Sequence, residues 1–131
     1  MKSFGIRKTL HATYDEALLR VPEALKAEGF GVLTEIDVKS TLKQKIGVDF
    51  RRYKILGACN PSLAHEALTA ELEIGLMLPC NVIVYEGDDG KAVVVAIDPT
   101  NTVASTGDPT LVKLAGTVKE KLTRVLSNLE R

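Results

Sequence analysis

Residues Tyr53 to Glu86 have the sequence YKILGACNPSLAHEALTAELEIGLMLPCNVIVYE, and they carry the strongest structural signals in the chain. The apolar run that ends at Cys59 predicts a buried strand. Asn60 and Pro61 predict the start of a helix, because asparagine accepts hydrogen bonds from the first turn and proline suits the first helical position. A second apolar run, residues 82–85, predicts another strand, so we expect strand, helix and strand in this order.

The residues before this stretch predict a strand, a helix, a second strand and a short helix. Residues 1–11 alternate between apolar and polar side chains, as a half-buried strand does. Thr13 and Glu16 have the spacing of a capping box, which opens a helix. Apolar and polar side chains alternate again over residues 30–38, which predicts the second strand. Residues 39–46 have helical spacing, with Leu42 and Ile46 expected to face inward.

The residues after it predict a hairpin and a long final helix. Asp89-Gly90 is a strong turn signal between residues 82–85 and 92–97. Both runs are apolar at odd and even positions, so we expect both faces of the hairpin to be covered. Asp108 caps the last helix, whose apolar side chains recur at steps of three and four: Leu111, Ala115, Val118, Leu122, Val125 and Leu129.

These elements predict one α+β domain over residues 1–131, a length that suits a single domain. We expect two layers, with a mixed sheet of about five strands and helices mainly on one of its faces. The expected order is strand, helix, strand, short helix, strand, helix, strand, strand, helix.

The composition excludes several classes of protein. Seventeen basic and seventeen acidic residues cancel, which argues against general nucleic-acid binding. No run approaches the roughly 20 apolar residues that span a bilayer, so we expect no membrane partner. We expect the alternating first residues to be a strand rather than a signal peptide, and two cysteines without an export signal then favour a cytoplasmic location.

One segment carries an excess of positive charge. Between residues 39 and 54, six basic side chains accompany one acidic side chain, that of Asp49. This is either a solvated surface or a patch that binds a small anion. For the second interpretation we select as candidate ligand-binding residues Lys39, Lys43, Arg51, Arg52 and Asn60.

The two cysteines are the candidate catalytic residues, although core packing is the commoner role of an isolated cysteine. Cys59 precedes a helix, whose positive end favours a thiolate. A simple crossover would make the flanking strands parallel and place Cys59 and Cys80 at opposite ends of the sheet. The segment Glu71 to Pro79 is long enough to alter this topology, so the sequence favours separate cysteines but leaves their meeting open. No CxxC, HxxxH, glycine-rich phosphate loop or GxSxG motif occurs, so we expect no metal site and no cofactor.

Three segments resemble a known family: GFGVLTEIDV (Gly29 to Val38), YKILGACNP (Tyr53 to Pro61) and IGLMLPCNVIVYE (Ile74 to Glu86). They are similar to the bacterial and archaeal family catalogued as domain of unknown function three hundred and two, and the likeness covers nearly the whole chain. The resemblance implies a two-layer α/β domain that often self-associates and has no established activity.

Three functional hypotheses follow from these observations. The leading one is a non-enzymatic module that binds a small ligand or anion near residues 39–61. The second is a thiol-dependent enzyme or redox protein that uses Cys59, with or without Cys80. The third is a structural domain whose role is dimerisation. The apolar second face of the hairpin needs a cover, and we expect a second copy of the chain to supply it in a homodimer; the alternative is a helix that crosses to this face.

Overall fold

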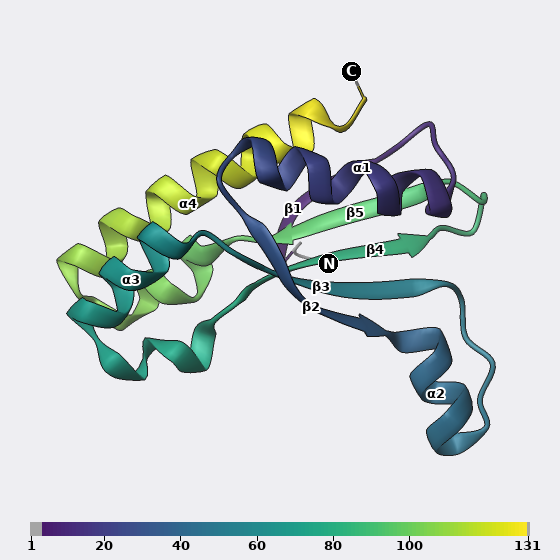
Figure 1. Ribbon diagram of the computed structural model, residues 1–131, viewed down its shortest axis with the longest axis horizontal. Helices are drawn as coiled ribbons and strands as arrows, with labels where there is room; N and C mark the ends of the chain where they lie inside the picture. Colours follow the sequence, from purple (N-terminus) through teal and green to yellow (C-terminus); the bar gives the residue numbers. More distant parts are fainter. Residues whose placement is uncertain (1–3, 131) are drawn as a thin grey trace.

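The structure, a computed structural model, describes residues 4–130. Five strands form one antiparallel sheet in the order β1-β5-β4-β3-β2 (Figure 1). The strands are β1 (Gly5–Thr9), β2 (Gly31–Asp37), β3 (Tyr53–Cys59), β4 (Cys80–Glu86) and β5 (Ala92–Ile97). The α-helices are α1 (Tyr14–Ala27), α2 (Val38–Ile46), α3 (Pro61–Ala70) and α4 (Pro109–Ser127). Four 3₁₀ turns complete the described chain: η1 (Leu72–Met77), η2 (Pro99–Asn101), η3 (Val103–Thr106) and η4 (Asn128–Glu130).

The predicted order of elements and the α+β class are confirmed, but the prediction of a mixed sheet is wrong. Strands β3 and β4 are antiparallel, with Ala58 opposite Cys80 and Tyr53 opposite Tyr85. In a parallel unit the connecting helix packs back along the sheet. Here α3 and η1 lie beyond the ends of the strands (Figure 1), so the chain re-enters the sheet at the end it left.

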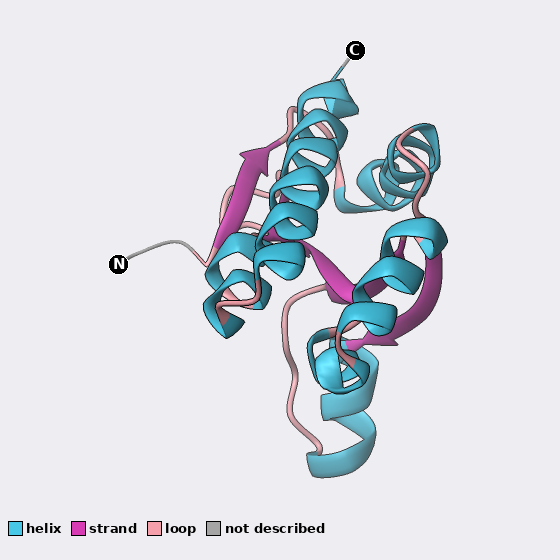
Figure 2. Cartoon of the chain, turned by 90° about the vertical axis from the view of Figure 1, so that its left-hand side faces the viewer, coloured by secondary structure: helices cyan, strands magenta, loops and turns pink. Residues whose placement is uncertain are grey.

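The main core lies between the sheet and the pair α1 and α4, which both cover one face (Figures 1 and 2). The predicted capping box starts α1, because the Thr13 hydroxyl accepts from the Glu16 amide and the Glu16 carboxylate accepts from the Thr13 amide. The buried side chains that join helices and sheet include Val21, Leu25, Leu56, Val82, Val84, Val94, Leu122 and Val125. Burial of these apolar surfaces is the largest contribution to folding.

A second, smaller core lies at the end of the sheet. It joins α3, η1, η3 and α4 through Ala67, Ile74, Val103, Leu111 and Ala115. This cluster is separate from the main core, and it holds in place the α3–η1 segment that connects β3 to β4.

The other face of the sheet, here called the open face, is also apolar. The strand register places Ile36, Ile55, Ile83 and Val95 side by side across four strands, and Ile97 follows on β5. These positions alternate with the side chains that α1 and α4 bury. Ile36 is 49% exposed, and its neighbours on this face are half-buried. The sheet therefore has one covered apolar face and one accessible one.

Helix α2 contradicts the expectation that Ile46 faces inward, whereas Leu42 is half-buried. It has no buried residue, and Ile46 is 67% exposed. The helix continues past the β2 edge of the sheet, away from α1 and α4 (Figure 1). Its ends are regular: the Asp37 carboxylate accepts from the Ser40 amide, and Gly47 ends the helix in the left-handed conformation that glycine favours.

Candidate functional site

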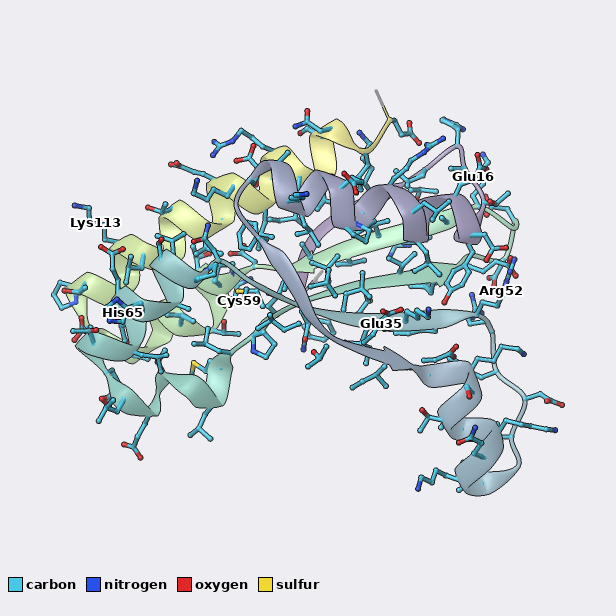
Figure 3. The ribbon with its side chains drawn as sticks, in the orientation of Figure 1. Glu16, Glu35, Arg52, Cys59, His65 and Lys113 are labelled. Carbon is cyan, nitrogen blue, oxygen red and sulfur yellow. The ribbon has the colours of Figure 1, made fainter. Side chains whose placement is uncertain are left out.

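The two cysteines line the same cavity, which is the less favoured of the two arrangements that the sequence left open. Because β3 and β4 are antiparallel neighbours, the last residues of β3 lie beside the first residues of β4. Cys80 is directly opposite Ala58, the residue before Cys59. Figure 3 places Cys59 where the sheet meets the α3 region. Neither thiol is in a disulfide.

The cavity that they line, here called the cysteine pocket, has a volume of about 50 Å³. The ends of β3 and β4 form its floor, and α3, η1, η3 and α4 surround it. Small side chains leave the space between the two helices: Ala64 and Ala67 on α3, and Ala115 on α4. The rest of the wall is mainly Phe30, Leu63, Ile74, Leu78, Pro79, Val103, Leu114 and Val118. The pocket is therefore almost wholly apolar.

A larger and more polar cavity adjoins it. This outer cavity has a volume of about 320 Å³ and shares five residues with the cysteine pocket: Leu78, Pro79, Cys80, Pro99 and Val103. Asn81 and Thr102 contribute polar groups to its wall. The two cavities together form a site with an apolar inner end and a polar outer end.

The wall formed by η2 is fixed by a buried carboxylate. Asp98 is 9% exposed, and its side chain accepts a hydrogen bond from the Thr100 amide and pairs with Lys119 at 2.9 Å. Burial raises the pKa of Asp98, but the hydrogen bonds from Thr100 and Lys119 outweigh it and the pKa is lowered. Asp98 is thus held ionised and ties η2 to α4.

The pocket determines the ionisation of Cys80. Burial in apolar surroundings, and secondarily the neighbouring Cys59, raise the pKa of Cys80 from its ordinary value of 9.0 to about 11. A thiolate is the reactive form of cysteine. At neutral pH Cys80 is therefore a protonated, small apolar group rather than a nucleophile.

The Asn60 side chain contributes to the wall and caps α3. Its Oδ1 accepts from the Leu63 amide at 3.3 Å, and its Nδ2 donates to the Glu28 carbonyl at 3.4 Å. Both polar atoms are thus used within the fold. Asn60 follows β3, whereas Arg51 and Arg52 precede it, so the predicted ligand-binding residues are divided between two ends of one strand.

The basic side chains of the predicted anion site contact partners within the fold. Lys39 Nζ donates to the Phe50 carbonyl at 2.8 Å, and Lys43 pairs with Asp49 at 3.2 Å. These contacts join α2 to the loop that follows it. They border a surface groove of about 320 Å³ whose own charges, two lysines and two aspartates, cancel.

The two arginines contact acidic residues that are distant in the sequence. Arg51 pairs with Asp88 at 2.9 Å, and Arg52 pairs with Glu86 at 2.9 Å and Asp15 at 3.1 Å. Hydrogen bonds to Glu86 and Asp15 raise the pKa of Arg52. The excess of positive charge in the sequence is therefore offset by carboxylates from other parts of the fold.

Metal-binding side chains do not gather at the cysteines. Within residues 4–130, no group of three or more His, Cys, Asp and Glu side chains could hold a metal ion. His65 lies on the exposed side of α3, as the sequence predicted (Figure 3). Over the same range, none of the helices has the length and hydropathy needed to cross a bilayer.

The sequence carried a signal for the pocket that our reasoning missed. Ala64 and Ala67 lie one turn apart on α3, and Ala115 follows Leu114 on α4. Alanines at facing positions leave space unless the helices approach each other closely. The pattern shows small side chains, but only the placement of α3 beside α4 turns them into a pocket.

Fold and site together define a class: a two-layer α+β domain with one antiparallel sheet and a small apolar pocket at the strand ends. The family model described as "Domain of unknown function DUF302" matches residues 6–129, and the chain belongs to this family. It is similar to a solved structure described as an uncharacterized conserved DUF302 protein from Bacillus stearothermophilus. The two share 33% identity over 96% of this chain and 98% of the other, with a TM-score of 0.88. A comparison with curated proteins found no match.

Proposed function

We propose that the domain binds a small ligand that places an apolar group in the cysteine pocket. The observation that carries this proposal is a preformed cavity of about 50 Å³ whose wall is almost wholly apolar and which adjoins a polar one. Ligand sites in proteins are typically concave and apolar, with a few polar groups that fix orientation.

The size of the pocket limits the ligand. One water-sized sphere needs about 10–15 Å³ of such volume, so the pocket admits a chain of about three or four atoms. A polar head group would then lie in the outer cavity, near Asn81 and Thr102. The expected ligand is therefore a short amphiphile, such as a small carboxylic acid or alcohol.

Two other hypotheses, an anion site at the basic segment and a thiol-dependent reaction, have less support. An anion at the basic segment would compete with the ion pairs that Lys43, Arg51 and Arg52 already make. A thiol-dependent reaction would depend on Cys59, because the raised pKa of Cys80 keeps that thiol protonated. Two free thiols also fit a reducing compartment, and we propose the cytoplasm as the location.

A binding experiment tests the pocket. Linear carboxylates of about four to eight carbons should raise the melting temperature of the protein, since a ligand that binds only the folded state stabilises it. Ala64→Leu fills the space between the helices and should abolish this rise. Ala70→Leu is the matched control, because Ala70 lies on the exposed side of the same helix and should leave the rise unchanged.

Two results would contradict the proposal. One is the absence of any shift in the wild type up to millimolar carboxylate. The other is an equal shift in Ala64→Leu and Ala70→Leu, which would place binding elsewhere on the molecule.

A second function is favoured by the open face: we propose that the domain forms a homodimer. Soluble monomers rarely expose contiguous apolar patches of more than a few hundred Å². Ile36, Ile55, Ile83 and Val95 form a contiguous apolar row across four strands on the face opposite α1 and α4, with Ile36 49% exposed and the other three half-buried. A second copy of the chain is the commonest cover for a surface of this kind. Light scattering of the full chain at micromolar concentration tests the homodimer, and the mass of a single chain would contradict it.

A further inference from the structure

The cysteine pocket has one end that opens on the outer cavity and one end that the main core closes. Five of its residues also line the outer cavity and mark the open end: Leu78, Pro79, Cys80, Pro99 and Val103. Phe30 and Val118 line the pocket but not the outer cavity. Phe30 belongs to the main core, and Val118 packs against it. A chain that enters from the outer cavity therefore points toward Phe30 and Val118, which we call the closed end.

The wall between α3 and α4 is closed by two leucines. Leu63 and Leu114 line both the cysteine pocket and a surface groove of about 630 Å³ that Glu66 and Lys113 also line. Both leucines are half-buried, so their side chains separate the pocket from the groove. A chain that is longer than the pocket must therefore displace a packed side chain before it reaches solvent on this side.

Phe30 is held in one position by the end of α1. Gly29 has a φ of 85°, in the left-handed region that glycine favours at a helix end. The Phe30 amide then donates to the Leu25 carbonyl at 3.0 Å. Phe30 is 3% exposed, so neighbouring side chains surround its ring. The ring cannot move aside for a ligand without loss of this packing.

Val118 adds a second fixed side chain at the closed end. It lies within α4, one turn after Leu114 and one turn before Leu122. A valine in a helix has one strongly preferred rotamer, because branching at Cβ restricts rotation against the preceding turn. The closed end is therefore rigid on both of its sides.

We propose that Phe30 and Val118 set the length of the alkyl chain that the pocket accepts, with the terminal methyl group of the chain against both. This rests on the ligand proposed above and names the residues that make its site selective. Each carbon atom that fits should increase the affinity by about fourfold, the value of one buried methylene group. Each carbon atom beyond the limit should decrease the affinity by about tenfold, because it forces packed side chains apart. The affinity should therefore have a sharp maximum at one chain length.

The test measures dissociation constants of straight-chain carboxylates for the full chain by titration calorimetry. Lengths of about three to ten carbons span the three or four atoms that the pocket admits. Val118→Ala removes two carbon atoms from the closed end and should move the best chain length upward by about two carbons. Val118→Ile adds one carbon atom there and keeps the branch at Cβ, so it should move the best length downward by about one carbon.

Val125→Ala is the matched control. Val125 lies on the same helix and is fully buried in the main core, but it is not one of the residues that line the pocket. The variant loses the same two carbon atoms without a change at the closed end, so its best chain length should equal that of the wild type. Thermal unfolding followed by circular dichroism establishes that each variant is folded. Phe30→Leu, which also removes atoms from the closed end, replaces Val118→Ala if the latter does not fold.

The outcomes separate this inference from the proposal on which it rests. A wild type that binds none of these carboxylates would overturn both. A wild-type affinity that keeps rising with length, or one best length shared by the wild type and both Val118 variants, would overturn the inference and leave the proposed ligand in place. An equal change in Val118→Ala and Val125→Ala would also overturn it, because loosening of α4 rather than the closed end would then set the length.

Discussion

The raised pKa of Cys80 predicts that the protein loses stability in mild alkali, and that Cys80→Ala loses less. Cys80 keeps its proton up to about pH 11 in the folded chain, whereas the same thiol has an ordinary pKa of 9.0 when exposed. Below pH 9 both states carry the proton, so the free energy of unfolding is unaffected. Between pH 9 and 11 only the unfolded state releases it, so unfolding becomes easier as the pH rises.

The magnitude follows from the two pKa values. A difference of about 2 units corresponds to about 2.7 kcal/mol once the pH exceeds both values. Near pH 10 about half of this has been lost, or about 1.4 kcal/mol. Tyrosines and lysines titrate in the same range, so the quantity to measure is the difference between the wild type and Cys80→Ala.

Urea denaturation at about pH 8, 9 and 10 in the presence of a phosphine reductant gives the unfolding free energy of each protein. The wild type should lose about 1.4 kcal/mol more than Cys80→Ala between pH 8 and pH 10. Val82→Ala is the matched control, because Val82 is fully buried on the same strand and has no proton to lose. The loss of unfolding free energy caused by Val82→Ala should be the same at every pH.

A constant difference between wild type and Cys80→Ala over this range would refute the reasoning. It would mean that the Cys80 thiol ionises as readily in the folded chain as in the unfolded one. The pocket would then contain enough water to solvate a thiolate, and Cys80 would return as a candidate nucleophile.

Two further substitutions test the site and the sheet by urea denaturation. Gly57→Ala should cost about 1–3 kcal/mol, because the new methyl group would meet the Pro79 ring at 2.8 Å and the Thr34 hydroxyl more closely still; Thr34→Ala in the same chain should recover part of the loss. Asn60→Ala should cost about 1 kcal/mol through loss of the α3 cap, while Asn60→Asp, which keeps the acceptor for the Leu63 amide, should cost less. An equal cost for both Asn60 variants would show that the bond to Glu28 matters more than the cap.

Signals between neighbouring residues were sufficient to predict the elements and their order. The Thr13 capping box, the Asn60 cap and the apolar spacing of α4 each depend on a few adjacent residues, and each is present in the structure. The same holds for the hairpin at Asp89-Gly90, where the turn residues themselves set the pairing of β4 and β5.

Features that depend on distant residues could not be predicted in this way. The direction of β4 depends on α3 lying beyond the strand ends, and no local pattern specifies where a helix packs. The partners of Arg52 lie 37 and 34 residues away, so a count of charges between residues 39 and 54 misses them. The spacing of Leu42 and Ile46 predicts which side of α2 is apolar, but not how much of that side its own chain covers: Leu42 is half-buried and Ile46 is exposed.

The presence of two separate cores has a consequence for how a ligand enters. The cysteine pocket lies where the main core meets the smaller cluster of Ala67, Ile74, Val103, Leu111 and Ala115. Small clusters with few apolar contacts open locally at a lower free energy than the whole fold. We therefore expect α3 and η1 to move together, away from the ends of β3 and β4, while all five strands stay paired. Opening of the α3–η1 segment that connects β3 and β4 would then admit a molecule wider than the closed cavity.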